Sequence, residues 1–291
     1  MSGICGIINR DGSPADKELT AAMTAMASHR GPDGIYHETY LNVGFGYGNT
    51  ARSREEAKDI PPVWLPDKSC AVVADARIYN RDPLLAKLGG SIDWCEGRAS
   101  DAALILAAYL KWGTELLQEI DGDFSFAIWD RDRKHFFAAR DPFGVKPFFY
   151  YAGQNHFIFA SEPKQILLHR NVSKESDKLI VGEYLFRNYE EVGRTFYKDI
   201  RRIRPAHYIL ADKNGIEEIR YWNPDPERET LLESREEYLD RFRELFLGSV
   251  RKRLDTDYPV VAQLSGGVDS SSVVAAAGAI YNAGQNGLPD F

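Results

Sequence analysis

The chain has 291 residues and a net charge of −7, from 36 Lys and Arg against 43 Asp and Glu, and 44% of its residues are hydrophobic. This length and apolar content predict two domains, and the acidic balance excludes a protein that holds nucleic acid by counterion release. Cys5, Cys70 and Cys95 are an odd number without paired zinc spacing, which favours a reducing, cytoplasmic compartment. Because no secretory signal and no run of about 18 apolar residues occurs, we expect neither export nor a membrane partner.

From residue 5 to about residue 210, short apolar runs alternate with turn residues and a few helical stretches. This pattern predicts one compact α+β domain, assigned to residues 1–210. The predicted strands cover residues 6–8, 43–47, 70–74, 124–129, 136–139, 147–151 and 157–160. The predicted helices cover residues 16–28, 101–112 behind a Ser100 cap, 164–168 and 179–186.

Residues 211–231 are polar and contain Asn214-Gly215 and Pro224-Asp225-Pro226, so we predict a linker there. A second domain is assigned to residues 232–291. It begins with a charged helix over 235–254, whose apolar stripe would pack on the segment that follows. The stripe consists of Leu239, Phe242, Leu245, Phe246 and Val250. A strand over 259–264, a glycine turn and a helix over 269–280 are predicted next.

The turn between that strand and helix reads Ser-Gly-Gly-Val-Asp-Ser-Ser over residues 265–271. Two adjacent glycines let the backbone approach a ligand, and the N–H groups and dipole of the helix start favour a phosphate group. The hydroxyls of Ser265, Ser270 and Ser271 add donors. Because the spacing lacks the lysine of a Walker loop, the pattern predicts retention of pyrophosphate rather than transfer of a γ-phosphate. The alternative interpretation is a serine-capped helix behind a glycine turn.

This loop resembles the signature of the N-type ATP pyrophosphatases. The resemblance implies ATP and Mg²⁺ as cofactors, with Asp269 helping to hold the metal. The residues implied to bind ATP are Ser265, Gly266, Gly267, Asp269, Ser270 and Ser271. In that family a substrate carboxylate attacks the α-phosphate, an amine captures the acyl-adenylate, and pyrophosphate and AMP leave.

Five motifs of the first domain, in order, are similar to those of class II glutamine amidotransferases. They are Cys5-Gly6-Ile7, His-Arg-Gly-Pro-Asp over 29–33, Ser100-Asp101, the long stretch 121–151, and Ser161-Glu162 with Lys164. The two domains in this order resemble asparagine synthetase over essentially the whole chain. The resemblance implies an N-terminal nucleophile-type αββα amidotransferase domain, followed by the start of an α/β ATP pyrophosphatase domain of the adenine nucleotide α-hydrolase kind.

In such glutaminases the nucleophile is a cysteine at the mature N-terminus, and its own α-amine acts as the base. The resemblance assigns this catalytic role to Cys5. Residues 2–4 would displace the free amine by up to about 10 Å in an extended chain, and the amide nitrogen of Cys5 cannot accept a proton. Unless processing exposes it, Cys5 therefore lacks its base. A small buried residue of the first strand is the favoured interpretation.

The glutamine pocket implied by the family has also changed. Asp75, Ala76 and Arg77 stand where the family has Asn-Gly-Glu, whose Asn and Gly form the oxyanion hole and whose Glu holds the glutamine ammonium. Asn49 aligns with the arginine that clamps the glutamine carboxylate, and only Asp101 remains of the usual ligands. A lost oxyanion donor costs about 3 to 4 kcal/mol, and an ionised carboxylate adds repulsion of about 4 kcal/mol. The hypothesis is a retained scaffold rather than a working glutaminase.

Family members that take their amine from their own substrate molecule need no ammonia. The stretch 75–81 and the Met-Ser-Gly-Ile prefix are most similar to lasso-peptide macrolactam cyclases. This favours an ATP-dependent amide-forming ligase that closes a precursor peptide, with a leader protease as a further partner.

Three alternatives remain open: an asparagine synthetase that hydrolyses glutamine, a ligase that uses another amine donor, and a non-catalytic scaffold or fragment. Only 20 residues follow Ser271, whereas an adenylating domain needs further strands and ligands. We therefore expect this chain to belong to a longer protein and to be inactive alone.

Overall fold

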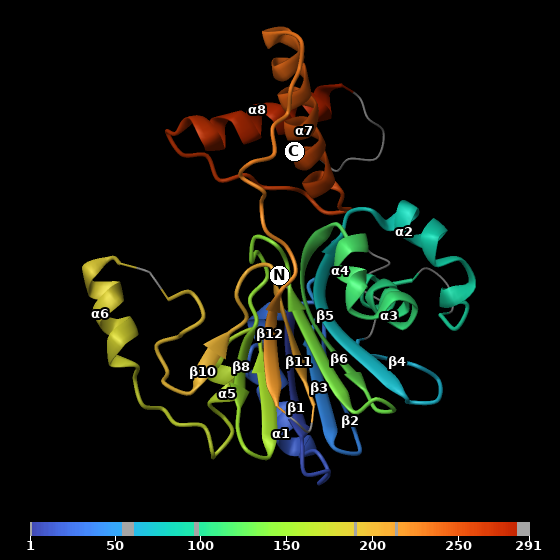
Figure 1. Ribbon diagram of the computed structural model, residues 1–291, viewed down its shortest axis with the longest axis vertical. Coiled ribbons are helices and arrows are strands. Elements are labelled where there is room, and N and C mark those ends of the chain that lie inside the picture. Colours follow the sequence, from blue (N-terminus) through green and yellow to red (C-terminus); the bar gives the residue numbers. More distant parts are fainter. Residues whose placement is uncertain (1, 54–60, 96–98, 189–190, 213–214, 284–291) are drawn as a thin grey trace. The chain divides into compact units, whose positions relative to one another are not determined.

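The computed structural model describes residues 2–53, 61–95, 99–188, 191–212 and 215–283. The chain divides into two compact units (Figure 1). The first consists of Met1–Thr50 and Asp59–Asn223, and the second of Ala51–Lys58 and Pro224–Phe291. Among the described residues, no helix is both long and apolar enough to cross a membrane.

The first unit contains two six-stranded antiparallel sheets that pack face to face. Sheet A has the strand order β10-β8-β9-β1-β3-β2, and sheet B has the order β12-β11-β7-β6-β5-β4. The strands of sheet A are β1 (Gly3–Asn9), β2 (Ile35–Tyr40), β3 (Val43–Gly48), β8 (Phe149–Ala152), β9 (His156–Ala160) and β10 (Ile200–Arg202). Those of sheet B are β4 (Val63–Trp64), β5 (Cys70–Ile78), β6 (Gly122–Asp130), β7 (His135–Arg140), β11 (His207–Ala211) and β12 (Ile216–Arg220).

Helices cover both outer faces of the pair of sheets. On sheet A lie α1 (Lys17–Met26) and α5 (Pro163–Ile166), and on sheet B lie α2 (Arg81–Leu88), α3 (Asp101–Trp112) and α4 (Leu116–Glu119). The layer order is therefore helix, sheet A, sheet B, helix, which confirms the predicted αββα fold. In the chain, α6 (Lys178–Phe186) separates β9 from β10.

The alternation of side chains along β1 assigns each residue to one of two cores. Ile4 and Ile8 belong to the core between the two sheets, whereas Cys5 and Ile7 belong to the core beneath α1. Even-numbered positions of β1 therefore enter the inter-sheet layer, and odd-numbered positions face α1.

The predicted helix over 101–112 is confirmed, with its cap. The Ser100 hydroxyl accepts a hydrogen bond from Ala103 N at 3.1 Å, which satisfies one of the donors left unpaired at a helix start. The helix is apolar nearly all round because it is buried against β5.

The predicted linker over 211–231 is wrong in its first half. β12 lies inside that range and pairs with β11 at the edge of sheet B. An edge strand meets solvent, so its polar composition resembles that of a loop. Gly215 of the Asn-Gly pair lies between these two strands, and Asn214 lies outside the described residues.

The second unit consists of α7 (Arg235–Leu254) and α8 (Val268–Asn282), which pack on each other through a small apolar cluster. The cluster contains Val250, Leu254, Ala276, Ala277 and Ile280. The predicted strand over 259–264 is wrong for the part of the chain that the structure describes. A strand requires a neighbour for its backbone N–H and C=O groups, and no described strand lies beside this segment.

Substitution of Gly46 by Ala should destabilise the first unit. Gly46 pairs with Cys5 in the sheet, and a Cβ there would lie 2.7 Å from Cys5 Sγ and closer still to Thr24 Oγ1. We expect a loss of about 1 to 3 kcal/mol in the free energy of unfolding, measured by denaturant titration. In the matched control Gly182→Ala, no atom lies within 4 Å, so the helix should be unchanged or slightly more stable. Equal stability of Gly46→Ala and the wild type would contradict this packing.

Candidate active site between the sheets

A buried ion pair lies at one end of the inter-sheet layer. Ala71 and Val73 on β5 point into this layer, so alternation brings Asp75 into it as well. Lys146 Nζ lies 2.7 Å from Asp75 Oδ1, and Asp75 is 2% exposed. The second oxygen, Oδ2, is buried and has no hydrogen-bond partner.

The loop after β7 holds Lys146 in this position. Asp141 accepts backbone hydrogen bonds from Phe143, Val145 and Lys146 at 2.9 to 3.1 Å. Arg140 donates to the carbonyls of Lys146, Gly144 and Ile203. These contacts fix the loop conformation, and the motif Asp-Pro-Phe-Gly-Val-Lys thereby delivers an ammonium group to Asp75.

Two opposing effects act on the Asp75 carboxyl. Burial raises its pKa, and the charges of Lys146 and Arg30 lower it. Arg30 packs against Gly3 at the start of β1, which brings the beginning of that strand and the end of β5 to the same end of the layer. An ionised Asp75 presents only hydrogen-bond acceptors at this point.

Ser2 also enters the inter-sheet layer, at the start of β1, and none of the sequence motifs singled it out. Its side chain precedes Ile4 by two positions and is 8% exposed. Ser2 Oγ accepts hydrogen bonds from Thr50 N at 3.1 Å and from the Tyr47 hydroxyl at 3.3 Å. The Tyr47 hydroxyl also lies 3.2 Å from Asn49 Oδ1. The available signal was strand alternation, because Ser2 stands two positions before Ile4 and so on the same face of the first strand.

Cys5 lies on the opposite face of sheet A. It is 1% exposed among apolar side chains such as Ile7 and Met23, and its Sγ is 3.6 Å from Thr24 Oγ1. Burial raises the pKa of the Cys5 thiol to about 12. The structure therefore does not bring Cys5 together with the implied glutamine pocket. Its assignment as the catalytic nucleophile is corrected, because β1 alternation turns it toward α1.

The implied pocket residues are divided between two layers. Alternation on the strands places Asn49, Asp75 and Arg77 in the inter-sheet layer, whereas Ala76 packs against the core beneath α3. Asp101 begins α3 on that same side.

Asp101, the one implied glutamine ligand that remains, makes contacts that stabilise the fold. Asp101 Oδ2 accepts a hydrogen bond from Ile78 N at 3.0 Å, and Arg81 forms an ion pair with Oδ1. The carboxylate thereby ties the start of α3 to the end of β5.

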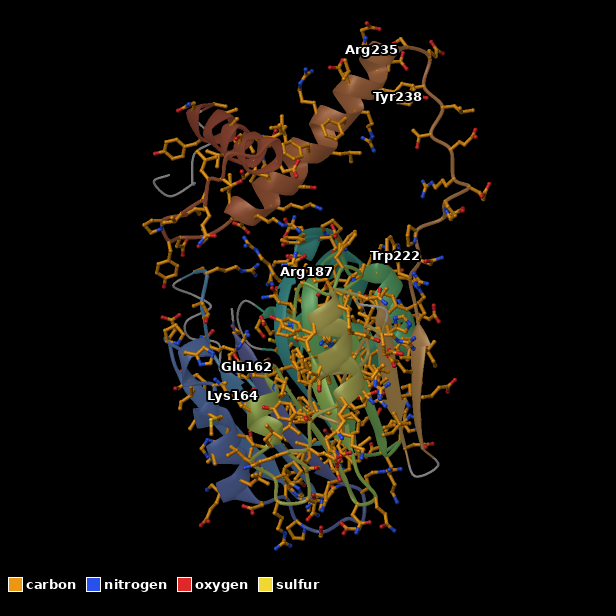
Figure 2. All side chains as sticks on the ribbon, turned by 90° about the vertical axis from the view of Figure 1, so that its left-hand side faces the viewer. Glu162, Lys164, Arg187, Trp222, Arg235 and Tyr238 are labelled. Carbon is orange, nitrogen blue, oxygen red and sulfur yellow. The ribbon has the colours of Figure 1, made fainter. Side chains whose placement is uncertain are left out.

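A second ionic cluster surrounds Glu162, the N-cap of α5 (Figure 2). Glu162 accepts hydrogen bonds from Arg30 Nε at 2.5 Å and His29 Nε2 at 2.8 Å, and Lys164 Nζ lies 2.9 Å away. Although burial opposes ionisation, these partners together lower the pKa of the Glu162 carboxyl to about 2. The cluster holds Arg30 beside the first strand.

The predicted phosphate loop is exposed at the start of α8. Ser265 Oγ and Ser270 Oγ lie 2.7 Å apart, Gly267 N donates to Ser265 Oγ at 3.3 Å, and Ser271 Oγ donates to Gly267 O at 2.8 Å. Gly266 has no atom within 4 Å of an added Cβ, so its backbone is open to a ligand.

These features fit a nucleotide phosphate at the start of a 15-residue helix. Asp269 is exposed in the first helical turn. Among the described residues, no three His, Cys, Asp or Glu side chains are grouped to hold a metal.

Two family profiles match this chain. The glutamine amidotransferase domain matches residues 1–222, and asparagine synthase matches residues 241–286. Glutamine-hydrolyzing asparagine synthetase 3 of Bacillus subtilis is 33% identical over 280 residues, which cover 95% of this chain and 45% of that protein. Amidase chyE of Penicillium rubens is 28% identical over 287 residues, covering 94% and 42%. The chain thus spans about half the length of these curated relatives.

Among solved structures, glutamine phosphoribosylpyrophosphate amidotransferase from B. subtilis, in complex with ADP and GMP, matches with a TM-score of 0.52. The match has 15% sequence identity and covers 75% of this chain and 49% of that one. This likeness supports the fold of the first unit.

Replacement of Glu162 by Gln should lower stability by about 1 to 3 kcal/mol at pH 7, because three partners lose a charged acceptor. The folded-state pKa of about 2 lies below the ordinary value of 4.5, so the contribution is complete above about pH 5. It should decline as the pH falls from 4.5 toward 2. Urea titrations of both variants at several pH values measure this difference.

The control for that series is Glu175→Gln, because Glu175 and its partner Lys198 are both 59% exposed. This variant should differ from the wild type by less than about 1 kcal/mol at every pH. A Glu162→Gln difference that does not change between pH 5 and pH 3 would contradict the assigned pKa.

Alkylation should distinguish the three thiols of the folded protein. Cys5 and Cys70 are buried, and burial is the first cause that raises the pKa of each to about 12, whereas Cys95 is partly exposed. Iodoacetamide at pH 8 should therefore modify Cys95 first and the other two only after unfolding, as measured by peptide mass spectrometry. Equally fast modification of Cys5 and Cys95 would show that the Cys5 thiol is accessible.

Proposed function

Because this chain belongs to the asparagine synthetase family, with a glutamine amidotransferase domain over its first 222 residues, we propose that it is part of an ATP-dependent amide-forming ligase whose amidotransferase domain has become a scaffold. The scaffold proposal rests on Asp75. In the family, a backbone or side-chain amide at this place donates hydrogen bonds to the oxyanion formed from glutamine.

The Asp75 carboxylate cannot supply that donor. Lys146 neutralises part of its charge at 2.7 Å, but Oδ2 remains a buried acceptor without a partner. A tetrahedral oxyanion placed there would meet another acceptor instead of an N–H group. Loss of one oxyanion donor alone costs about 3 to 4 kcal/mol of transition-state stabilisation, roughly a thousandfold in rate. The Asp101 carboxylate, engaged by Arg81, offers no compensation.

The ligase half of the proposal rests on the loop of residues 265–271. ATP bound at this loop would activate a substrate carboxylate by adenylation. The backbone of Gly266 and Gly267 and the first turn of α8 would receive the phosphates, and Asp269 would hold Mg²⁺ against them. A scaffold domain that supplies no ammonia suits a ligase whose amine is carried by the substrate itself.

The substrate that suits both halves is a peptide whose own amine closes on an activated carboxylate. We infer a macrolactam-forming cyclase, supported by the Asp-Ala-Arg-Ile-Tyr-Asn-Arg stretch over 75–81. Arg81 of this stretch forms an ion pair with Asp101, so the carboxylate that remains of the implied glutamine ligands is engaged within the chain.

Amide hydrolysis by Ser2 is a second candidate, and one observation favours it. Ser2 Oγ lies at the start of β1 in the same layer as Asp75 and Asn49, and loss of Met1 would give Ser2 its own amine as a base. Amidase chyE is among the relatives. On this hypothesis Ser2 Oγ attacks the amide carbon and the α-amine takes its proton. The α-amine would return that proton to the leaving nitrogen as the C–N bond breaks, and water would then hydrolyse the ester on Ser2 to release the acid.

Assays of the full-length protein separate the two candidates. With Mg-ATP and a cognate precursor peptide, pyrophosphate should be released and the peptide should lose one water in mass. Added glutamine should neither accelerate this reaction nor yield ammonia above background. Ser2→Ala should leave pyrophosphate release within about twofold of the wild type, because a scaffold residue contributes no chemistry.

Asp269→Asn serves as the matched loss-of-function control and should lower pyrophosphate release by at least about tenfold. Steady ammonia release from glutamine that Ser2→Ala abolishes would overturn the scaffold proposal and favour hydrolysis. The cyclase proposal would be overturned if none of the candidate peptides increased pyrophosphate release above the rate measured without peptide.

A further inference from the structure

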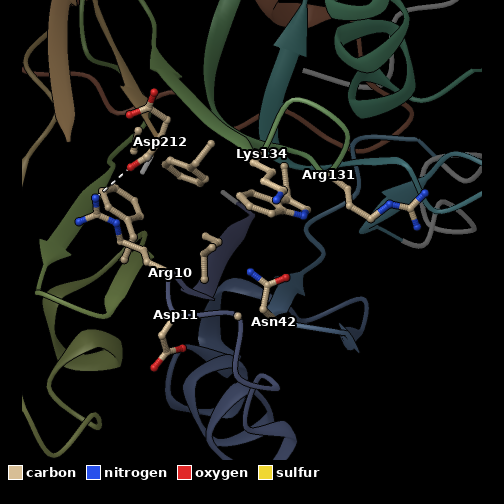
Figure 3. Close-up of a pocket in the computed structure, with 12 residues that line it drawn as sticks. Arg10, Asp11, Asn42, Arg131, Lys134 and Asp212 are labelled. Atoms are coloured by element: carbon tan, nitrogen blue, oxygen red, sulfur yellow. Dashed lines mark hydrogen bonds between the residues drawn. The ribbon is translucent and has the colours of Figure 1, made fainter. Parts of the chain in front are cut away.

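We propose that a pocket at the other end of the inter-sheet layer binds a small anion that carries an aromatic ring. β1 starts beside Ser2 and runs to Asn9, so about 20 Å separates the two ends at about 3.3 Å per residue. The pocket opens where β1 and β11 end, where β9 begins, and where the β6–β7 hairpin turns (Figure 3). It is therefore distinct from the polar group around Asp75.

The pocket has a volume of about 360 Å³, within the range of small-molecule sites. Its lining combines an apolar floor with a charged rim. The floor includes Trp129, Phe136 and Phe157, and the rim includes Arg10, Lys134 and Asp212.

The floor is aromatic and belongs to the core between the sheets. Phe136 and Phe157 are 2% and 1% exposed, and their ring centroids lie 4.4 Å apart. Trp129 is partly buried and packs against the same core. Rigid aromatic side chains at the base of a pocket favour a flat ring, which they contact over its face or edge.

Arg10, Arg131 and Lys134 line the rim of the pocket, and Figure 3 shows the Arg131 guanidinium directed away from the aromatic floor. Arg10 Nη2 donates to the Asp212 carbonyl at 2.9 Å, which orients the guanidinium and leaves other N–H donors of the fork for a ligand. Lys134 is exposed, and within the described chain its ammonium forms no hydrogen bond or ion pair. Its backbone has φ 54°, which holds the residue at the hairpin turn.

The two acidic residues of the rim are engaged elsewhere. Asp11 Oδ1 accepts hydrogen bonds from Ser13 N at 3.0 Å and Ser13 Oγ at 2.7 Å, and Figure 3 shows its carboxylate directed away from Arg10. Asp212 Oδ1 accepts from Gly215 N at 3.1 Å. Arg131 forms an ion pair with Asp132 at 3.5 Å. Because both rim carboxylates complete turns, Arg10 and Lys134 are the charged groups that a ligand meets.

The size and charge of the pocket define the class of ligand. An aromatic ring would lie on the floor, and a phosphate or carboxylate would reach Arg10 and Lys134 through charge-assisted hydrogen bonds. The net charge of −7 opposes binding of a polyanion, so the ligand is a small molecule.

The test uses phenyl phosphate as the probe, with phenol and inorganic phosphate as its two halves. Isothermal titration of the protein should give saturable binding of phenyl phosphate with Kd of about 1 mM or tighter, and at least fivefold weaker binding of either half. Lys134→Gln and Arg10→Gln should each weaken phenyl phosphate binding about tenfold, because each removes a charge-assisted contact.

The matched control is Lys68→Gln, since Lys68 also has a positive φ, 58°, in a hairpin turn but lies outside the pocket. This variant should bind phenyl phosphate as the wild type does. Both Lys134 and Arg10 are exposed, so their variants should fold, and thermal unfolding verifies this.

Three results would overturn the proposal: no saturable binding of phenyl phosphate below about 10 mM, equal affinity for phenol and phenyl phosphate, or unchanged affinity in both pocket variants. The outcome is independent of whether the protein hydrolyses glutamine or forms amides, because no residue of either reaction lines this pocket.

Discussion

Side chains of a β-strand alternate between its two faces, and here this alternation decides which groups can react together. Even positions of β1 and odd positions of β5 share the layer between the sheets, so Ser2 and Asp75 enter it while Cys5 faces α1. A shift of one residue would exchange the two sets. Glycines such as Gly46 allow sheet A to approach Thr24 closely and fix this arrangement.

The inter-sheet layer differs in character at its two ends. At the start of β1 it holds the buried ion pair of Asp75 and Lys146. The unpaired acceptor Asp75 Oδ2 makes this end unsuited to an oxyanion. At the other end its aromatic core reaches the surface beneath a rim of cations. A buried ion pair is a weak source of stability but a strong constraint on geometry, since either partner alone would be costly. The loop that carries Lys146 is correspondingly tied by Asp141 and Arg140.

In the second unit the phosphate-loop motif is present, but the strand that was predicted before it is not formed in the described residues. α7 and α8 bury a shared cluster, and among the described residues no paired strand precedes the phosphate loop. The apolar stripe of α7 is correspondingly divided. Val250 is buried against α8, whereas Phe242 is 67% exposed. Helix propensity and capping act locally, whereas a strand needs a neighbouring strand. In the second unit the sequence therefore predicted the two helices correctly but not the strand.

The sequence by itself determined the two units, the αββα fold, the helices over 101–112 and 235–254, and the changed residues at 75–77, because caps, periodicity and motifs are local signals. Only the tertiary structure decided the rest. It turned Cys5 away from the site, divided Asp75 from Ala76, recruited Ser2 and Lys146, and made β12 an edge strand. These results depend on which face of a sheet meets which neighbour, and that pairing joins residues far apart in the chain.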